Sequence, residues 1–391
     1  MRIRRKIQLA GLAVAMVGGV SGTAEAGDRT ISTAVDAPVV TSNPDGSGIA
    51  GDVTITASGT ITVEAAEAGV TVNSNNDVSN AGSIVASDAN NATGILLQGG
   101  NSGTITNSGA ITLTETYVIA DSDSDGNLDG NLAIGTNRHA IFLQAGPTFT
   151  GDILSSGFIT VEGNNSSGIT LNGLLTGDLT VSSALAITGE NSFGVAINGG
   201  VTGDAVITGG GAVRGQNSVG VHVNSAIGGE LSVNGSWATT GYLSTTVPAD
   251  QGTLDSDDLE QGGSVLLVNG NVAGGVTIEG IGVENDIDDD DDGEENEADD
   301  NVGAVLSSFG SAPVLHFQAD GSNLVVGAGA EGYGLLVRGQ VVANGLFNGV
   351  EATGVRIEGD GLGATATITG GVSIDNSLTA NASEEIGRAH V

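Results

Sequence analysis

The sequence NSFGVAIN at residues 191–198 recurs 26 residues later as NSVGVHVN, at residues 217–224. It also occurs 26 residues earlier in the relaxed form NSSGITLN, at residues 165–172. The three copies align without a gap. Self-similarity at a fixed period is typical of proteins built from stacked structural repeats. We therefore take the 26-residue repeat as the unit of the fold.

A second marker, Gly followed by Asp or Glu, keeps the same step and begins at Gly151, Gly177, Gly203 and Gly229. Because two unrelated motifs share one period, the repeat extends over the whole unit and is not confined to a single short motif.

One repeat, residues 191–216, contains three short runs in which apolar and polar residues alternate: Gly194–Asn198, Asp204–Thr208 and Gly211–Gly215. Such alternation indicates half-buried β-strands, and Gly and Asn between the runs tolerate the positive φ of tight corners. Three short strands and three corners make one turn of a triangular coil. The expected fold is all-β, a right-handed parallel β-helix (β-solenoid) with three short strands per coil.

The two-residue period of a strand assigns the faces of each run. We expect Thr170, Ala196 and His222 to face outward. The pair Trp237/Thr239 fits the inward pattern least well and is expected to mark the edge of the regular array. The expected inward pairs are Ile169/Leu171, Val195/Ile197 and Val221/Val223 in the first strands, Leu179/Val181, Ala205/Ile207 and Leu231/Val233 in the second, and Ile159/Val161, Leu185/Ile187 and Gly211/Val213 in the third.

A single coil cannot be stable alone. About six inward aliphatic side chains contribute roughly 9–18 kcal/mol when buried, whereas ordering the backbone costs about 1–2 kcal/mol per residue. The difference has to come from hydrogen bonds and packing shared with neighbouring coils. We therefore expect the array to fold cooperatively.

The pattern extends less regularly in both directions, which predicts one continuous solenoid over residues 47–382 after a lead-in at residues 27–46. Three acidic insertions interrupt the period without ending it, at residues 117–131, 242–260 and 284–300. The third has 12 acidic residues among the 17 from Glu284 to Asp300, so it should loop into solvent.

Both ends of the chain differ from the repeats. A basic stretch ending at Lys6, an apolar run Ile7–Val20 and small residues at Ala24 and Ala26 predict a signal peptide over residues 1–26. The alternative, a transmembrane anchor, would need about 20 apolar residues. The tail, residues 383–391, ends in a segment that resembles a translated sequencing adapter. We expect this tail to be an assembly artefact and the natural protein to continue; the alternative is a genuine basic tail.

The charge balance excludes one class of partner. The chain has 10 Lys+Arg against 46 Asp+Glu, and removal of residues 1–26 takes four bases and Glu25 with it. Nucleic-acid binding requires clustered cations, so no nucleic acid is expected as a partner. There is no Cys, so stability cannot come from disulfides.

Two insertions have the carboxylate spacing of a calcium loop, in which oxygens at alternate positions converge on one cation. Neither has the Glu that usually closes such a loop, and the alternative is a solvated acidic loop. Calcium is the only cofactor the sequence suggests. The candidate metal ligands are Asp121, Asp123, Asp125 and Asp129 in the first insertion and Asp288, Asp290, Asp292 and Asp299 in the third.

No catalytic constellation is recognisable. The four histidines, His139, His222, His316 and His390, lie far apart in the sequence, and neither H-E-x-x-H nor G-x-S-x-G occurs. His222 is expected to be a surface residue of its coil. We therefore expect a protein that is not an enzyme.

The leader and the N-S-x-G-[VI]-x-[VI]-N coils at Asn191 and Asn217, with the relaxed form at Asn165, resemble the passenger region of an autotransporter, a type V secreted protein of Gram-negative bacteria. The resemblance spans most of the chain. It implies a β-helical stalk outside the cell, anchored at the outer membrane through a C-terminal β-barrel that is missing from this sequence.

The expected function is an exported cell-surface structural or adhesive solenoid without catalysis. Its partner would be a component of a host or neighbouring-cell surface or of the extracellular matrix. One alternative is a calcium-dependent surface-layer or matrix protein. Another is a β-helix enzyme that acts on polysaccharides, for which Arg214, Arg338 and Arg356 are isolated candidate bases.

Overall fold

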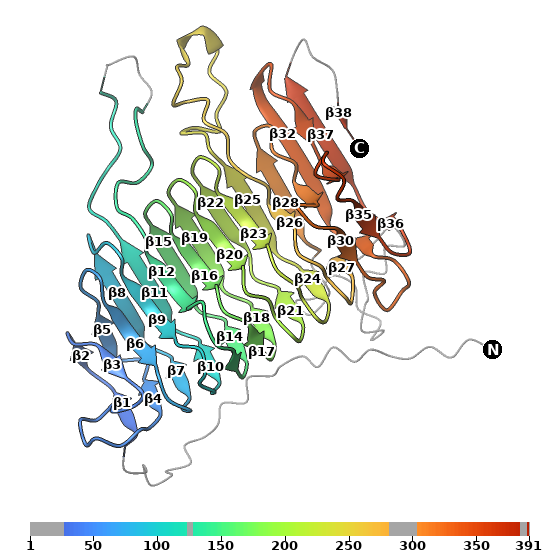
Figure 1. Ribbon diagram of the computed structural model, residues 1–391. Helices are drawn as coiled ribbons and strands as arrows, with labels where there is room; N and C mark the ends of the chain where they lie inside the picture. The colour runs from blue at the N-terminus through green and yellow to red at the C-terminus, as the bar shows by residue number, and fades with distance from the viewer. Residues whose placement is uncertain (1–26, 123–127, 281–302, 384–388, 391) are drawn as a thin grey trace, which may run out of the picture.

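The computed structural model describes residues 27–122, 128–280, 303–383 and 389–390, and it shows a single stack of coils (Figure 1). Three long, entirely parallel sheets run along the stack and enclose a core of aliphatic side chains. Neighbouring strands of a sheet come from successive coils. The protein is a right-handed parallel β-helix, as the repeat predicts.

Sheet A contains one short strand from each coil. Its strands are β1 (Arg29–Ile31), β4 (Val53–Ile55), β7 (Val78–Asn80), β10 (Ile105–Asn107), β14 (Ile153–Ser155), β18 (Leu179–Val181), β21 (Ala205–Ile207), β24 (Leu231–Val233), β27 (Val276–Ile278), β31 (Leu335–Val337) and β36 (Val372–Ile374).

The Gly-Asp marker lies at the corner before sheet A, where its carboxylates link successive coils. Oδ1 of Asp152 accepts the backbone N–H of Asp178 at 2.9 Å, and Oδ1 of Asp178 accepts the N–H of Asp204 at 2.9 Å. Oδ1 of Asp204 accepts the N–H of Glu230 at 2.8 Å. A carboxylate therefore recurs with the repeat because it satisfies a backbone donor of the next coil.

Sheet B lies on the second side of the triangle. Its strands are β2 (Ala34–Val35), β5 (Thr60–Thr62), β8 (Ser83–Ser87), β11 (Ala110–Thr114), β15 (Phe158–Glu162), β19 (Ala184–Thr188), β22 (Gly211–Arg214), β25 (Ser236–Thr240), β28 (Val305–Phe309), β32 (Gln340–Asn348) and β37 (Leu378–Ser383).

Trp237 of sheet B lies inside the regular array, so the expectation that it marks the edge is wrong. It is 1% exposed, and its strand β25 pairs with β22 and β28. The ring fills space left by glycines, because a Cβ added to Gly211 would lie 2.4 Å from the ring and one added to Gly194 would lie 2.8 Å from it. Nε1 of Trp237 donates to the carbonyl oxygen of Gly209 at 2.8 Å.

Sheet C contains the repeated motif. Its strands are β3 (Val39–Val40), β6 (Ala68–Val72), β9 (Thr93–Leu97), β12 (His139–Leu143), β16 (Ser167–Leu171), β20 (Phe193–Ile197), β23 (Val219–Val223), β26 (Leu266–Val268), β29 (Leu315–Gln318) and β34 (Val355–Glu358). Three short pairs complete the strands: β13 (Phe149–Thr150) with β17 (Leu175–Thr176), β30 (Leu324–Val326) with β35 (Ala366–Ile368), and β33 (Ala352–Thr353) with β38 (Ala389–His390).

The first two residues of the motif make the corner before sheet C. Asn191 and Asn217 adopt positive φ values of 52° and 58°, which Asn tolerates better than most residues. Ser192 and Ser218 are 0% exposed, and Oγ of Ser218 accepts the backbone N–H of Ser192 at 2.9 Å. Each serine therefore satisfies a buried backbone donor of the preceding coil.

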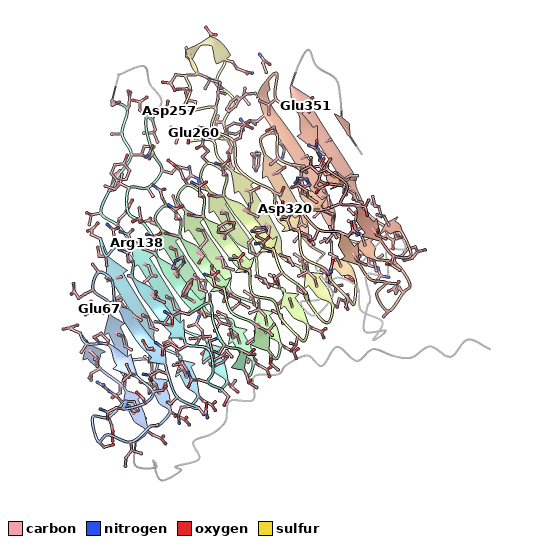
Figure 2. The ribbon with its side chains drawn as sticks, in the orientation of Figure 1. Glu67, Arg138, Asp257, Glu260, Asp320 and Glu351 are labelled. Atoms are coloured by element: carbon pink, nitrogen blue, oxygen red, sulfur yellow. The ribbon has the colours of Figure 1, made fainter. Side chains whose placement is uncertain are left out.

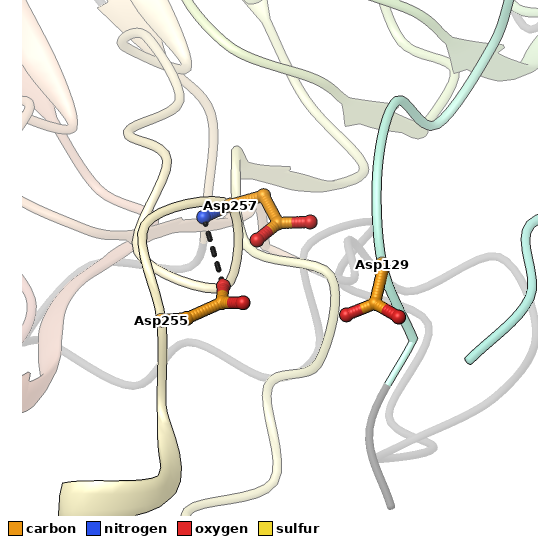
Figure 3. Close-up of side chains that lie close together, drawn as sticks. All are labelled: Asp129, Asp255 and Asp257. Atoms are coloured by element: carbon orange, nitrogen blue, oxygen red, sulfur yellow. Dashed lines mark hydrogen bonds between the residues drawn. The ribbon is translucent and has the colours of Figure 1, made fainter. Parts of the chain in front are cut away.

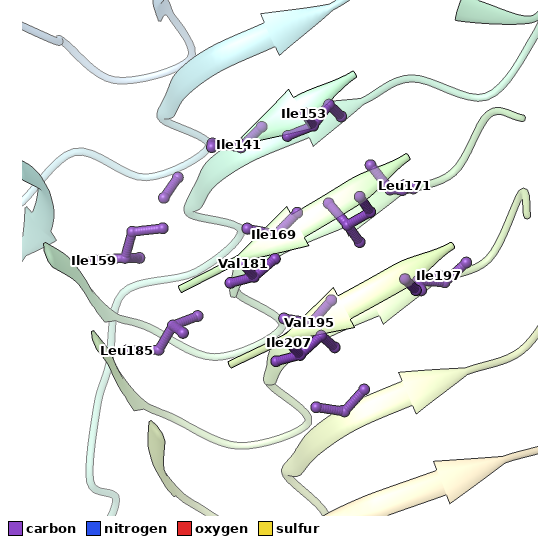
Figure 4. Packing of buried hydrophobic residues seen from close by; sticks show 14 of the residues in the cluster. Ile141, Ile153, Ile159, Ile169, Leu171, Val181, Leu185, Val195, Ile197 and Ile207 are labelled. Atoms are coloured by element: carbon purple, nitrogen blue, oxygen red, sulfur yellow. The ribbon is translucent and has the colours of Figure 1, made fainter. Parts of the chain in front are cut away.

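The inward faces are as the sequence predicts (Figure 4). Val195, Ile197, Ala205 and Ile207 are all 0% exposed. The copies stack in register, with Ile169 beside Val195 and Val195 beside Val221. Small aliphatic side chains returning once per coil therefore form the core.

The stack begins earlier than expected. The supposed lead-in, residues 27–46, contains β1, β2 and β3, and Arg29 of β1 pairs with Val53 of β4. Strands of two or three residues show too little alternation to be recognised in a sequence. The first coil therefore starts before Ser47.

In the part of the chain that the structure describes, no helix has the length and apolar character needed to cross a membrane. The one helix among the described residues is η1 (Gln251–Thr253), a 3-10 turn. The expected signal peptide, residues 1–26, and the third insertion, residues 284–300, lie outside the described residues, as does most of the tail.

Candidate functional site

Two of the acidic insertions project from the same edge of the stack (Figure 1). The first lies between β11 and β12, and the second lies between β25 and β26. They are far apart in the sequence, but the stacking of the coils brings Gly130 of the first insertion into contact with Asp257 of the second. We call these two segments, residues 117–131 and 242–260, the crest.

Arg138 fixes the base of the first insertion (Figure 2). Its guanidinium lies 3.1 Å from Oε2 of Glu115, and the two side chains are 1% and 4% exposed. Glu115 also accepts the backbone N–H groups of Ile134 at 2.8 Å and Gly135 at 2.6 Å. The ion pair therefore holds together the chain segments that enter and leave the insertion.

The second insertion is attached to the stack by aromatic packing. Tyr242 is 0% exposed, and its hydroxyl donates to the carbonyl oxygen of Gly345 at 3.0 Å. The rings of Tyr242 and Phe347 pack edge to face with centroids 4.6 Å apart. Farther out, Oε1 of Gln251 accepts the backbone N–H of Asn348 at 2.8 Å. The strand β32, which lies about a hundred residues further along the chain, therefore supports the second insertion.

The two insertions meet at a cluster of three carboxylates (Figure 3). The side chains of Asp129, Asp255 and Asp257 each have an oxygen within 4.8 Å of the other two. The Gly130 N–H donates to the carboxylate of Asp257 across the junction, and the Asp257 N–H donates to Oδ1 of Asp255 at 3.2 Å. Carboxylate oxygens gathered in this way are the ligands that Ca²⁺ prefers.

Two of the three carboxylates, those of Asp255 and Asp257, affect each other's pKa. A side-chain hydrogen bond to Asp257 raises the pKa of Asp255, and the neighbouring negative charge acts in the same direction. The same bond lowers the pKa of Asp257, as does the hydrogen bond from the Gly130 N–H. The pair therefore shares its proton unequally, which is characteristic of carboxylates held close together.

The structure places the predicted metal ligands unevenly. Asp121 is exposed and Asp129 is half-buried, and only Asp129 of these two belongs to the cluster. Asp123 and Asp125 lie outside the described residues, as do all four candidates of the third insertion: Asp288, Asp290, Asp292 and Asp299. The calcium loops therefore stay predictions.

Sequence reasoning missed Asp255, Asp257 and Arg138. The two aspartates come close to Asp129 only because two insertions project from one edge, which no local spacing encodes. Arg138 had a usable signal. It follows Asn137 in a coil where the motif elsewhere has Ser, and a charge at that position has to be paired when it is buried.

Three of the four histidines lie on strands of one sheet. His139, His222 and His316 are in β12, β23 and β29 of sheet C, and all three are half-buried. Burial lowers the pKa of His139 to about 4 and lowers that of His222. Nε2 of His222 lies 3.0 Å from Oδ1 of Asn269, and Nε2 of His316 lies 2.9 Å from Oε1 of Glu358.

A shallow hollow of about 510 Å³ lies on the outer face of sheet B. Its floor consists of small residues such as Ala212 and Ala238, and Val305 and Phe309 bound it on one side. Its lining contains no carboxylate, histidine or lysine. The hollow therefore offers shape but no acid or base for catalysis.

No protein-family model, curated protein or solved structure matches this chain.

Proposed function

We propose that this chain is the passenger of an autotransporter: an exported structural or adhesive solenoid at the cell surface, anchored at the outer membrane and without catalysis. The observation that carries the proposal is the continuous stack of coils, in which successive coils donate strands to the same three sheets. Such a stack is an extended scaffold whose corners and faces are repeated along its length.

Charge and composition support the same proposal. The net charge of −36 at pH 7 keeps an extended surface soluble and repels nucleic acid. The core consists largely of Val, Ile, Leu and Ala, and it is shared by all the coils from β1 onward. The chain can therefore be long and rigid without disulfides.

The export part of the proposal is tested with the full natural gene in a Gram-negative host. Intact cells are treated with protease, and the mature N-terminus is sequenced. We expect surface cleavage and a mature chain that starts at Gly27. Replacing Ala26 with a bulky residue such as Phe should block processing, whereas the same change at Ala50 should not. A chain that keeps Met1 and stays protected inside the cell would contradict export.

A second candidate, a calcium-dependent surface-layer or matrix protein, is favoured by the carboxylate cluster at the crest. Calcium bound by Asp129, Asp255 and Asp257 would join the two insertions at the point where they meet. Thermal unfolding with calcium and with a chelator tests this candidate. The Asp257→Asn variant should lose any calcium-dependent rise in Tm, and Asp360→Asn serves as the matched control. An unchanged Tm in the parent chain would exclude the candidate.

A further inference from the structure

The outer face of sheet C has a column of carboxamide side chains. In eight consecutive coils, the residue that follows the last inward side chain of the sheet C strand is Asn or Gln. Strand pairing keeps these residues at one level from coil to coil. The amide column consists of Asn73, Gln98, Gln144, Asn172, Asn198, Asn224, Asn269 and Gln318.

Part of the amide column is accessible to a partner. Gln144, Asn198 and Asn224 are exposed, and the other members are half-buried. Among the described residues, one hydrogen bond joins neighbouring side chains of the column, from Nδ2 of Asn198 to Oδ1 of Asn172 at 2.8 Å. Two further members link neighbouring coils: Oδ1 of Asn73 accepts the Ser42 N–H at 2.9 Å, and Asn269 bonds both the His222 ring and the carbonyl oxygen of Gln318. The exposed amides of Gln144 and Asn224 are therefore the members best placed to meet a partner.

Flat rings lie beside the amide column on the same face. His139 stacks on Phe142 with ring centroids 4.7 Å apart and an interplanar angle of 23°. Phe193 stacks on His222 with centroids 5.6 Å apart and an angle of 20°. All four rings are half-buried. Each pair therefore leaves part of its surface open to a partner.

This face carries no formal charge over much of the stack. From β6 to β29, neither the sheet C strands nor the amide column contain Asp, Glu, Lys or Arg, although the chain has 46 acidic residues. The next strand, β34, ends this stretch with Arg356 and Glu358. Burial lowers the pKa of His139 to about 4, so this ring is neutral at physiological pH.

We propose that the outer face of sheet C binds a neutral, extended polysaccharide that lies along the stack; this rests on the proposed adhesive function and names its ligand class. Carboxamides donate and accept hydrogen bonds, as sugar hydroxyls do. Flat rings pack against the apolar faces of sugar rings. Equivalent strands recur about every 4.8 Å, so a linear polymer meets a carboxamide again in each of the eight coils.

The negative charge of the chain favours a neutral polymer over an anionic one. A net charge of −36 repels a polyanion at long range, and the sheet C face offers no cation between β6 and β29 to pair with one. A neutral glycan meets no such barrier.

The experiment measures binding of the purified mature chain to neutral hexasaccharides by calorimetry. The probes are cello-, xylo-, manno- and laminarihexaose, with polygalacturonate as the anionic comparison. The test variant Gln144→Ala/Asn224→Ala removes two exposed amides and should weaken binding roughly tenfold, the effect of losing two modest hydrogen bonds. The rescue variant Gln144→Asn/Asn224→Gln should retain most of the affinity.

The matched control is Thr112→Ala/Thr160→Ala on the outer face of sheet B, which should bind as the parent chain does. Circular dichroism verifies that each variant is folded. The proposal is overturned if no neutral hexasaccharide binds with a Kd below about 1 mM, if polygalacturonate binds more tightly, or if the control loses as much affinity as the test variant. Surface exposure of the chain is measured separately, so an exposed protein that binds no glycan overturns this inference and leaves the passenger proposal intact.

Discussion

Trp237 is a large ring in a core that consists largely of small aliphatic side chains. Its neighbours make room for it, because Gly194 and Gly211 carry no side chain where the ring lies. The inward position paired with Trp237 in the adjacent coil is Gly211, whereas the coil before that has Leu185. A large inward side chain in one coil is therefore accommodated by a small residue at the paired position of the neighbouring coil.

The packing of the Trp237 ring against Gly211 predicts the effect of two substitutions. Trp237→Ala should lower the free energy of unfolding by about 3–5 kcal/mol, because it leaves a cavity. Gly211→Ala should cost about 1–3 kcal/mol, because its Cβ would meet the ring. Denaturant unfolding measures both. Phe158→Ala, at a side chain that is 73% exposed, is the control and should change little. If Trp237→Ala cost no more than this control, the ring would not be part of the core.

His139 predicts how stability depends on pH. Burial lowers the pKa of His139 from 6.5 to about 4, so the unfolded chain takes up this proton at a higher pH than the folded chain. The contribution is fully present above about pH 6.5 and is lost as the pH falls toward 4, by at most about 3 kcal/mol.

The matched comparison is His139→Phe, which keeps a ring beside Phe142 but cannot be protonated. The difference in unfolding free energy between the parent chain and this variant should be constant above pH 7. It should then shift in favour of the variant as the pH falls through 6 and 5. A difference that does not change with pH would mean that His139 is freely protonated in the fold.

At the scale of elements, the ion pair between Arg138 and Glu115 predicts how the first insertion is held. Arg138→Ala leaves the Glu115 carboxylate buried without its cation, which should cost about 3–5 kcal/mol. It should also expose residues 117–131 to protease, because the base of the insertion opens. Limited proteolysis and denaturant unfolding measure the two effects.

The double variant Arg138→Ser/Glu115→Gln should recover much of the lost stability. Serine is the residue of the equivalent coils, and a Gln carbonyl can still accept the Gly135 N–H that Glu115 accepts. Arg356→Ala is the control, because that side chain is 55% exposed and pairs at the surface with Glu358. Equal losses in the single and double variants would show that the charge pair itself is unimportant.

Some elements of this structure can be predicted from the sequence, and others cannot. The inward pairs around Val195 and Ala205 follow from alternation and a fixed period, both of which are local. The first coil was missed because β1 to β3 are too short to alternate. The carboxylate cluster was missed because Asp129 and Asp257 belong to insertions without the period, and only the stacked coils between them bring these residues together.

At the scale of the whole molecule, the first and last described coils differ in how much of their inward side chains is exposed to solvent. In the first coil, Ile31 and Val39 are 2% and 1% exposed, although among the described residues their strands β1 and β3 pair on one side only. In the last coil, Val372 and Ile374 are 40% and 38% exposed. The equivalent residues of the coil before it, Leu335 and Val337, are 0% and 1% exposed. The inward side chains of β36 are therefore more exposed to solvent than those of β31.

This difference in exposure predicts how far a charge placed at an inward position destabilises the stack. Val195→Asp places a carboxylate between two coils in the middle of the stack, so it should interrupt the shared core and destabilise coils on both sides. Val372→Asp places the same group in the last coil, where solvent reaches it, and should affect only β36 and its neighbours. Hydrogen exchange measures the extent of each effect. We expect loss of protection from β16 to β24 in the first variant and from β34 to β37 in the second. Equal and global loss in both would mean that the stack unfolds as one unit, because cooperativity would then exceed the nearest-neighbour coupling expected for stacked repeats.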